Sequence, residues 1–256
     1  MTLRVGAALA DGLDDLLSRR GVTVLGVFLV YSFLNTVLWQ SASPAIDRSL
    51  ASVFPGATQA PPAVSAESPL ALDLSLGAVL ALLVVLFAVG EILRILAIRL
   101  FASEADVFDP AVTADLGPTM VTALAAAVLT AVAVALGTLV FVFPGVVLAL
   151  LFFFVRQEIA LNDSGVIDAI RESIRLVTDN AVPVLALAAV LFVLGVVVSL
   201  PLQLVGIPGQ SLAVTLVTTA LSQLVTVFGI AVVTSAYRRV AAGQAPGPAP
   251  SIDEAF

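Results

Sequence analysis

The sequence lacks the side chains on which many catalytic and metal sites depend. It contains no cysteine and no histidine, and all 11 of its basic residues are arginine. Without cysteine there can be no disulfide and no thiolate metal site, and without histidine the commonest general base and metal ligand is missing. We also find no G-x-S-x-G element, phosphate-binding loop or metal-ligand spacing. The sequence therefore predicts no catalytic, cofactor-binding or metal-binding residue, and we expect a protein that is not an enzyme.

Charge is also scarce. Only 11% of the residues are charged and 60% are hydrophobic, whereas a soluble domain of ordinary composition is about one quarter charged. This excess of apolar residues indicates an integral membrane protein. The net charge of −7 argues against nucleic acid as a partner, because binding to phosphates needs basic contacts. An acidic composition without lysine indicates a halophilic host.

Long apolar runs mark the predicted membrane spans. A bilayer core about 30 Å thick needs roughly 20 helical residues to cross it. Five runs meet this requirement, and they cover about residues 21–40, 75–94, 118–143, 181–203 and 211–237. A sixth run, 145–161, is shorter and carries Arg156 and Glu158 near its end. It either crosses as a short span or re-enters on the same side.

The distribution of arginine decides between these two topologies, because basic residues near span ends favour the cytoplasmic side. If 145–161 crosses, ten of the 11 arginines lie inside and only Arg48 lies outside. If it re-enters, five lie inside and six outside. We therefore predict six spans in three hairpins within residues 1–240, with Phe143, Pro144 and Gly145 forming an outer turn.

The segments between the spans are predicted as follows. Residues 2–19 and 165–178 have helical apolar periodicity and are expected to form amphipathic helices on the cytoplasmic membrane surface. Residues 41–74 form one long outer loop, and residues 241–256 form a disordered cytoplasmic tail. The apolar stripe expected on the first helix consists of Val5, Leu9, Leu13, Leu16 and Leu17. Its acidic residues Asp11, Asp14 and Asp15 are interpreted as a solvated face rather than a metal site.

Charged residues at the inner ends of two spans are the candidate functional residues. Glu91 and Arg94 end the second span, and Arg156 and Glu158 end the fourth. We expect the pairs Glu91–Arg156 and Arg94–Glu158, because charges at this depth are costly unless they are paired or hydrated. These residues either line a vestibule for a polar or anionic ligand or hold two hairpins in register, and the second interpretation is favoured.

Gln223 lies near the centre of the last span. An amide at this depth usually bonds a neighbouring helix. We favour that role over a polar site on a translocation path.

The stretch that follows Pro144-Gly145 resembles a group of uncharacterised haloarchaeal membrane proteins, which are distantly similar to the membrane domain attached to some glycerophosphodiester phosphodiesterases. The residues that carry the resemblance are Ile159, Asn162, Asp163, Gly165, Asp168, Ala169, Ile170, Ser173, Leu176 and Asn180. The resemblance implies a six-span fold. It implies no phosphodiesterase chemistry, because the sequence contains no such catalytic domain.

Together these observations predict an all-α, polytopic bundle of six transmembrane helices in the cytoplasmic membrane, with both termini in the cytoplasm. The favoured function is a non-enzymatic scaffold or accessory subunit, whose partners are the lipid bilayer and other membrane proteins. The alternative is a small-solute or lipid transporter or a permease subunit. A scaffold predicts a closed apolar core, whereas a transporter predicts a polar cavity that reaches Gln223.

Overall fold

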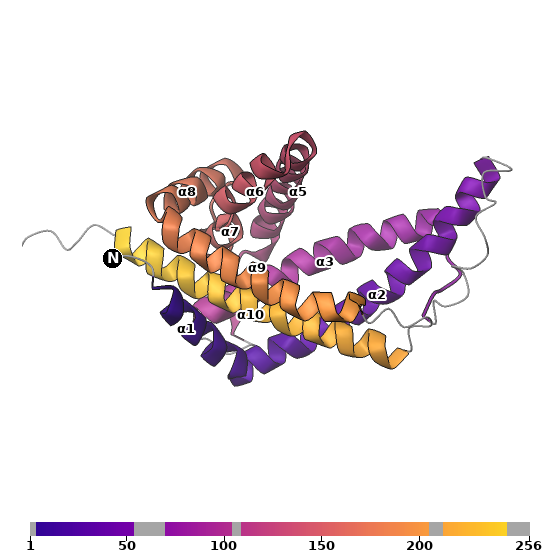
Figure 1. Ribbon diagram of the computed structural model, residues 1–256, viewed down its shortest axis with the longest axis horizontal. Helices are drawn as coiled ribbons and strands as arrows, with labels where there is room; N and C mark the ends of the chain where they lie inside the picture. The colour runs from indigo at the N-terminus through magenta and orange to yellow at the C-terminus, as the bar shows by residue number, and fades with distance from the viewer. Residues whose placement is uncertain (1–3, 54–69, 104–108, 205–211, 245–256) are drawn as a thin grey trace, which may run out of the picture.

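The computed structural model describes residues 4–53, 70–103, 109–204 and 212–244, and the regular structure in these ranges is entirely helical (Figure 1). The helices are α1 (Val5–Leu17), α2 (Arg19–Val53), α3 (Leu76–Ala102), α4 (Pro110–Thr113), α5 (Leu116–Val140), α6 (Val142–Leu151), α7 (Val155–Asn162), α8 (Val166–Asp179), α9 (Ala181–Leu204) and α10 (Leu212–Gln244). The predicted all-α class is confirmed.

Six helical segments of the described chain are long and apolar enough to cross a membrane, as the sequence predicted. They are Arg19–Val53, Leu76–Ala102, Leu116–Val140, Val142–Asn162, Ala181–Val198 and Leu212–Gly243. The fourth of these segments consists of α6 and α7, which a turn at residues 152–154 separates.

Helix α2 is longer than the predicted span and continues through Pro44 to Val53, so the first part of the predicted outer loop is helical. The segment that returns towards α3 is bonded to this extension. Gln40 Oε1 accepts from the Leu70 backbone N–H at 3.1 Å, and Arg48 pairs with Asp73 at 2.9 Å. Residues 54–69 of the predicted loop and 245–256 of the predicted tail lie outside the described residues.

The turn expected at Phe143, Pro144 and Gly145 lies elsewhere. Phe141 alone separates α5 from α6, and Pro144 is in the first turn of α6. The prediction was wrong because proline is tolerated in the first turn of a helix, where its missing N–H has no intrahelical partner to lose. Gly145 lets α5 and α6 pack closely, since a Cβ there would lie 2.9 Å from the Thr138 Cα.

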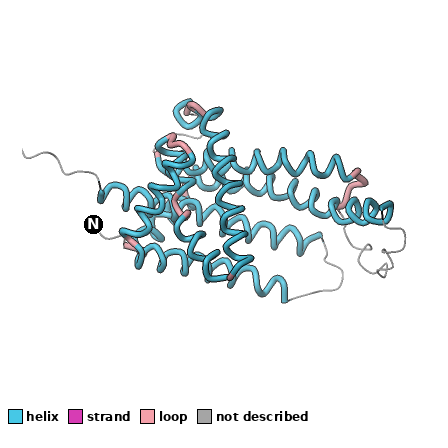
Figure 2. Tube along the Cα trace, turned by 90° about the horizontal axis from the view of Figure 1, so that it is seen from above, coloured by secondary structure: helices cyan, strands magenta, loops and turns pink. Residues whose placement is uncertain are grey.

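The helices are arranged around α10, which contacts α1, α2, α3 and α9. Helices α2 and α3 lie side by side, and so do α9 and α10, whereas α5 and α6 run across that direction next to α7 and α8 (Figures 1 and 2). Charged side chains from α3 and α7 come together where these groups meet.

Helix α1 packs on α10 through small residues and through part of the predicted leucine stripe, since Val5 and Leu9 lie against the core cluster that contains Val232. Its buried residues are Ala8, Gly12 and Leu16, whereas Leu13 and Leu17 are 48% and 70% exposed. The reason is a close helix approach. A Cβ on Gly12 would lie 2.3 Å from the Val232 Cγ2 and 2.9 Å from the Val232 Cα.

We expect Gly12→Ala to destabilise the protein by about 1–3 kcal/mol, because the new methyl group overpacks against the α10 backbone. Gly6→Ala is the matched control, because a Cβ on Gly6 meets nothing within 4 Å. Alanine is the better helix former, so the control should be neutral or stabilising. Thermal unfolding of both variants in detergent micelles tests this, and equal shifts would contradict the close contact.

Helix α8 turns one face inwards, with Ala169, Ser173, Leu176 and Val177 buried. Ser173 Oγ donates to the Leu151 carbonyl at 2.8 Å and accepts from the Phe154 N–H at 3.1 Å. The helix is thereby fastened to the turn between α6 and α7. Two ion pairs, Asp168–Arg171 and Glu172–Arg175, form on its exposed side.

Candidate functional site

The predicted ionic cluster is built around Glu91, a residue of α3 that is only 1% exposed. Its Oε1 accepts from Arg94 Nη1 at 2.6 Å. Arg156, the second residue of α7, donates from Nε to Oε2 and from Nη2 to Oε1, both at 3.2 Å. The structure thus brings together Glu91 and Arg156, as the sequence suggested, and one buried carboxylate holds two guanidinium groups.

Glu158 lies in a different environment, and the expected Arg94–Glu158 pair does not form. Its carboxylate accepts from the Tyr237 hydroxyl, from Asn162 Nδ2 at 3.0 Å and from Ser164 Oγ at 2.8 Å. Residues two apart on a helix point to nearly opposite faces. Arg156 therefore faces α3 while Glu158 faces α10, so the two cannot belong to one cluster.

Gln223 joins two other helices. Its Nε2 donates to the Ser32 Oγ at 3.1 Å, which connects α10 to α2. Ser32 is 9% exposed. The geometry is that of a polar bond between neighbouring helices, the role that the sequence favoured for this residue.

Arg99 was counted in the sequence only as a basic residue near a span end, yet it makes more hydrogen bonds than any predicted candidate. Its Nε donates to the Ala160 carbonyl at 2.8 Å. Its Nη2 donates to Asp163 Oδ1 at 2.8 Å and to Thr119 Oγ1 at 3.2 Å. Its Nη1 donates to the carbonyls of Val112 and Ala114. All five guanidinium N–H groups are therefore used, and Arg99 connects α3, α4, α5 and α7.

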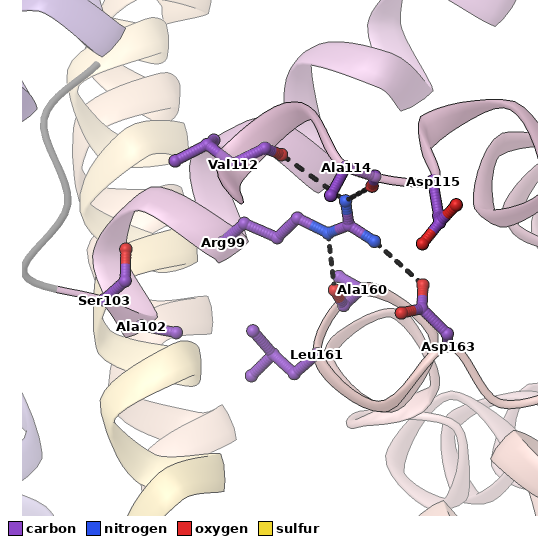
Figure 3. Close-up of a pocket in the computed structure, with 9 residues that line it drawn as sticks. All are labelled: Arg99, Ala102, Ser103, Val112, Ala114, Asp115, Ala160, Leu161 and Asp163. Atoms are coloured by element: carbon purple, nitrogen blue, oxygen red, sulfur yellow. Dashed lines mark hydrogen bonds and ion pairs between the residues drawn. The ribbon is translucent and has the colours of Figure 1, made fainter. Parts of the chain in front are cut away.

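A pocket of about 300 Å³ opens beside Arg99 (Figure 3). Two non-glycine residues with a left-handed backbone line it, Asp115 with φ 49° and Asp163 with φ 50°. Aspartate tolerates this region better than most residues. Asp163 ends α7 and points its carboxylate at Arg99, while Gly165 precedes α8.

The acidic residues of α1 do not form a uniform solvated face. Asp11 Oδ2 accepts from Ser235 Oγ at 2.7 Å and from Arg239 Nη2 at 2.6 Å, both on α10. Partial burial alone would raise the pKa of Asp11, but the bonds from Ser235 and Arg239, together with the positive charges of Arg239 and Arg238, outweigh it and hold the pKa below its ordinary value of 3.8. Among the described residues, no group of three or more His, Cys, Asp or Glu side chains could hold a metal ion.

Arg99 and the Glu91 cluster, which contains Arg94 and Arg156, differ in whether they have N–H groups left to bind a ligand. Arg99 has no donor left and its side chain is 10% exposed, so it acts inside the fold. Arg94 and Arg156 are 36% and 49% exposed, and some of their N–H groups have no acceptor within the described part of the chain. The Glu91 cluster is therefore the centre that can meet a ligand.

Comparison with known proteins supports an uncharacterised family. Residues 3–240 match the model of a domain of unknown function, DUF7847. No curated protein and no solved structure matches the chain. The family match supports neither the haloarchaeal nor the phosphodiesterase relationship that the sequence suggested.

Proposed function

Because the chain belongs to the DUF7847 family, whose description names no activity, we propose its function from its own side chains. It is a multi-pass membrane protein that acts as a non-enzymatic scaffold or accessory subunit. The observation that carries this proposal is that three sets of polar side chains along the apolar helices are bonded within the protein, although Gln157 Oε1 and Thr234 Oγ1 are buried without a partner among the described residues. Gln223 is bonded to Ser32, Glu91 to two arginines, and Glu158 to Tyr237. A transport path needs such groups to face water or a substrate.

The proposal includes an orientation in the cytoplasmic membrane with both termini in the cytoplasm. The arginine distribution supports it, because in the six-span arrangement every basic residue except Arg48 lies on the cytoplasmic side, the side that basic residues near span ends favour. Three hairpins with α1 and α8 at the membrane surface complete this topology. The acidic, lysine-free sequence supports a halophilic host. A distant relationship to the membrane domain of the phosphodiesterases stays a prediction.

The transporter alternative makes an opposite prediction about water near Gln223, and the absence of cysteine makes the test direct. Single variants Gln223→Cys and Ser32→Cys in native membranes are treated with a small hydrophilic thiol reagent. A scaffold leaves both unlabelled from either side. Gly165→Cys is the positive control, because Gly165 is exposed and a Cβ there meets only Asp168 Oδ2 at 3.9 Å.

A second measurement asks whether the protein has protein partners. Gently solubilised membranes are separated on a native gel, and the proposed role predicts a complex much larger than the chain itself. If the protein migrates alone and Gln223→Cys is labelled, the scaffold proposal is overturned and a transport function takes its place. Labelling of Gly165→Cys from outside intact cells would overturn the proposed orientation.

A further inference from the structure

The Glu91 cluster carries an unbalanced charge. One carboxylate accepts bonds from two guanidinium groups, so the three side chains have a net charge of +1. Both arginines approach Glu91 Oε1, at 2.6 Å and 3.2 Å. They therefore lie next to each other and repel. Such an arrangement is stabilised by a second anion, and more strongly where the surroundings exclude water.

The arginines also present free donors. The bonds to Glu91 use Nη1 of Arg94 and both Nε and Nη2 of Arg156. In the described part of the chain, Nε and Nη2 of Arg94 and Nη1 of Arg156 remain for another acceptor. Glu91 is 1% exposed while the two arginines are 36% and 49% exposed. A buried carboxylate thus fixes two partly exposed guanidinium groups, the side chain best suited to phosphate oxygens.

The depth of the cluster identifies the anion. Helix α3 begins at Leu76, just after Asp73 and Ser75. At 1.5 Å per residue Arg94 lies about 27 Å further along the helix, close to the roughly 30 Å thickness of the hydrocarbon core. The arginines therefore lie at the level of the lipid headgroups when α3 crosses the bilayer. The anions present there at high concentration are lipid phosphodiesters.

We propose that Arg94 and Arg156, held side by side by Glu91, bind the phosphodiester of a membrane lipid headgroup. The inference goes beyond the proposed scaffold function and does not depend on it. The bound lipid supplies the negative charge that the cluster lacks and connects α3 to α7 through the headgroup. Arg99 takes no part, because its N–H groups are all bonded within the protein.

The test uses the full chain, purified in a neutral detergent and followed by thermal unfolding. Three additions are compared at equal concentrations: dioleoyl phosphatidylglycerol, dioleoylglycerol and inorganic phosphate. We expect only the phospholipid to raise the unfolding midpoint of the wild type. In Arg94→Gln and in Arg156→Gln, the lipid concentration needed for half of the effect should rise at least about tenfold, because charge-assisted bonds are lost.

Arg171→Gln is the matched control. It makes the same charge change at an exposed pair with Asp168, whose side chains are 75% and 73% exposed, so its response should equal that of the wild type. If a variant does not fold, native mass spectrometry of the wild type still decides, because phosphatidylglycerol should stay bound and dioleoylglycerol should not. Equal effects of both lipids, equal responses of wild type and both variants, or replacement of the lipid by inorganic phosphate would each overturn the proposal.

Discussion

The double variant Arg94→Gln, Arg156→Gln is expected to be destabilised by about 3–5 kcal/mol, because removing both partners leaves a buried, uncompensated carboxylate. Glu91 is 1% exposed, so its charge cannot reach water without separating α3 from α7. Each single glutamine variant keeps one arginine on Glu91 and should lose much less. Chemical unfolding in detergent micelles, together with protease sensitivity, measures the loss.

A triple variant separates lost charge balance from lost packing. Adding Glu91→Gln to the double variant removes the buried charge and keeps the side-chain volumes, so most of the stability should return. The exposed double variant Arg171→Gln, Arg175→Gln makes the same charge change on α8 and should behave like the wild type. A silent double variant, or a triple variant as unstable as the double, would show that Glu91 is not held by these arginines.

The architecture was largely predictable because apolar run length is a direct consequence of bilayer thickness. The six predicted runs correspond to the six candidate spans of the described chain. The boundaries were less predictable, because they depend on individual residues. Pro144 was expected to end a helix and instead lies in the first turn of α6. The segment after Gln40 looked like loop, yet it is helical as far as Val53, and the returning chain is bonded to it at Ser41 and Arg48.

In the candidate site, the sequence predicted the Glu91–Arg156 ion pair correctly but not the partners of Glu158. The pairing of Glu91 with Arg156 followed from two charges at adjacent span ends. The second expected pair was wrong because Arg156 and Glu158 were treated as one group, although positions two apart on α7 face different neighbours. Helical periodicity assigns Glu158 to the opposite face, but the sequence does not show that Tyr237 lies there.

Arg99 was missed because most of its partners are backbone carbonyls, which every residue carries and no side-chain pattern reveals. The one informative signal was Asp163, an acidic residue directly after a short amphipathic stretch. Its left-handed backbone ends α7 and turns the carboxylate towards α3. Counting arginines placed Arg99 on the cytoplasmic side of the membrane. It did not predict that Arg99 connects α3, α4, α5 and α7.

Replacing Arg99 with glutamine is therefore expected to cost about 2–4 kcal/mol, because buried carbonyls lose their donor and Asp163 loses its counter-charge. Asp163 is 55% exposed, so water screens part of the lost ion pair, and the carbonyls of the buried residues Val112 and Ala160 dominate. The carbonyl of Ala114, an exposed residue, can bond water instead. Arg99→Lys should recover little stability, because one ammonium cannot reach acceptors placed around a planar guanidinium.

The loss of stability in Arg99→Gln should be confined to the segments that Arg99 connects. A general effect of removing a surface charge would not be confined in this way. Amide hydrogen exchange should increase in α4, at the start of α5 and at the end of α7, where the acceptors of Arg99 lie. It should not change around Gly12, where α1 packs on α10 through small residues. Arg175→Gln, which removes an arginine from an exposed pair on α8, should leave all of these regions unchanged. Unchanged exchange in Arg99→Gln would mean that the carbonyls find water instead, and that Arg99 does not hold the four segments together.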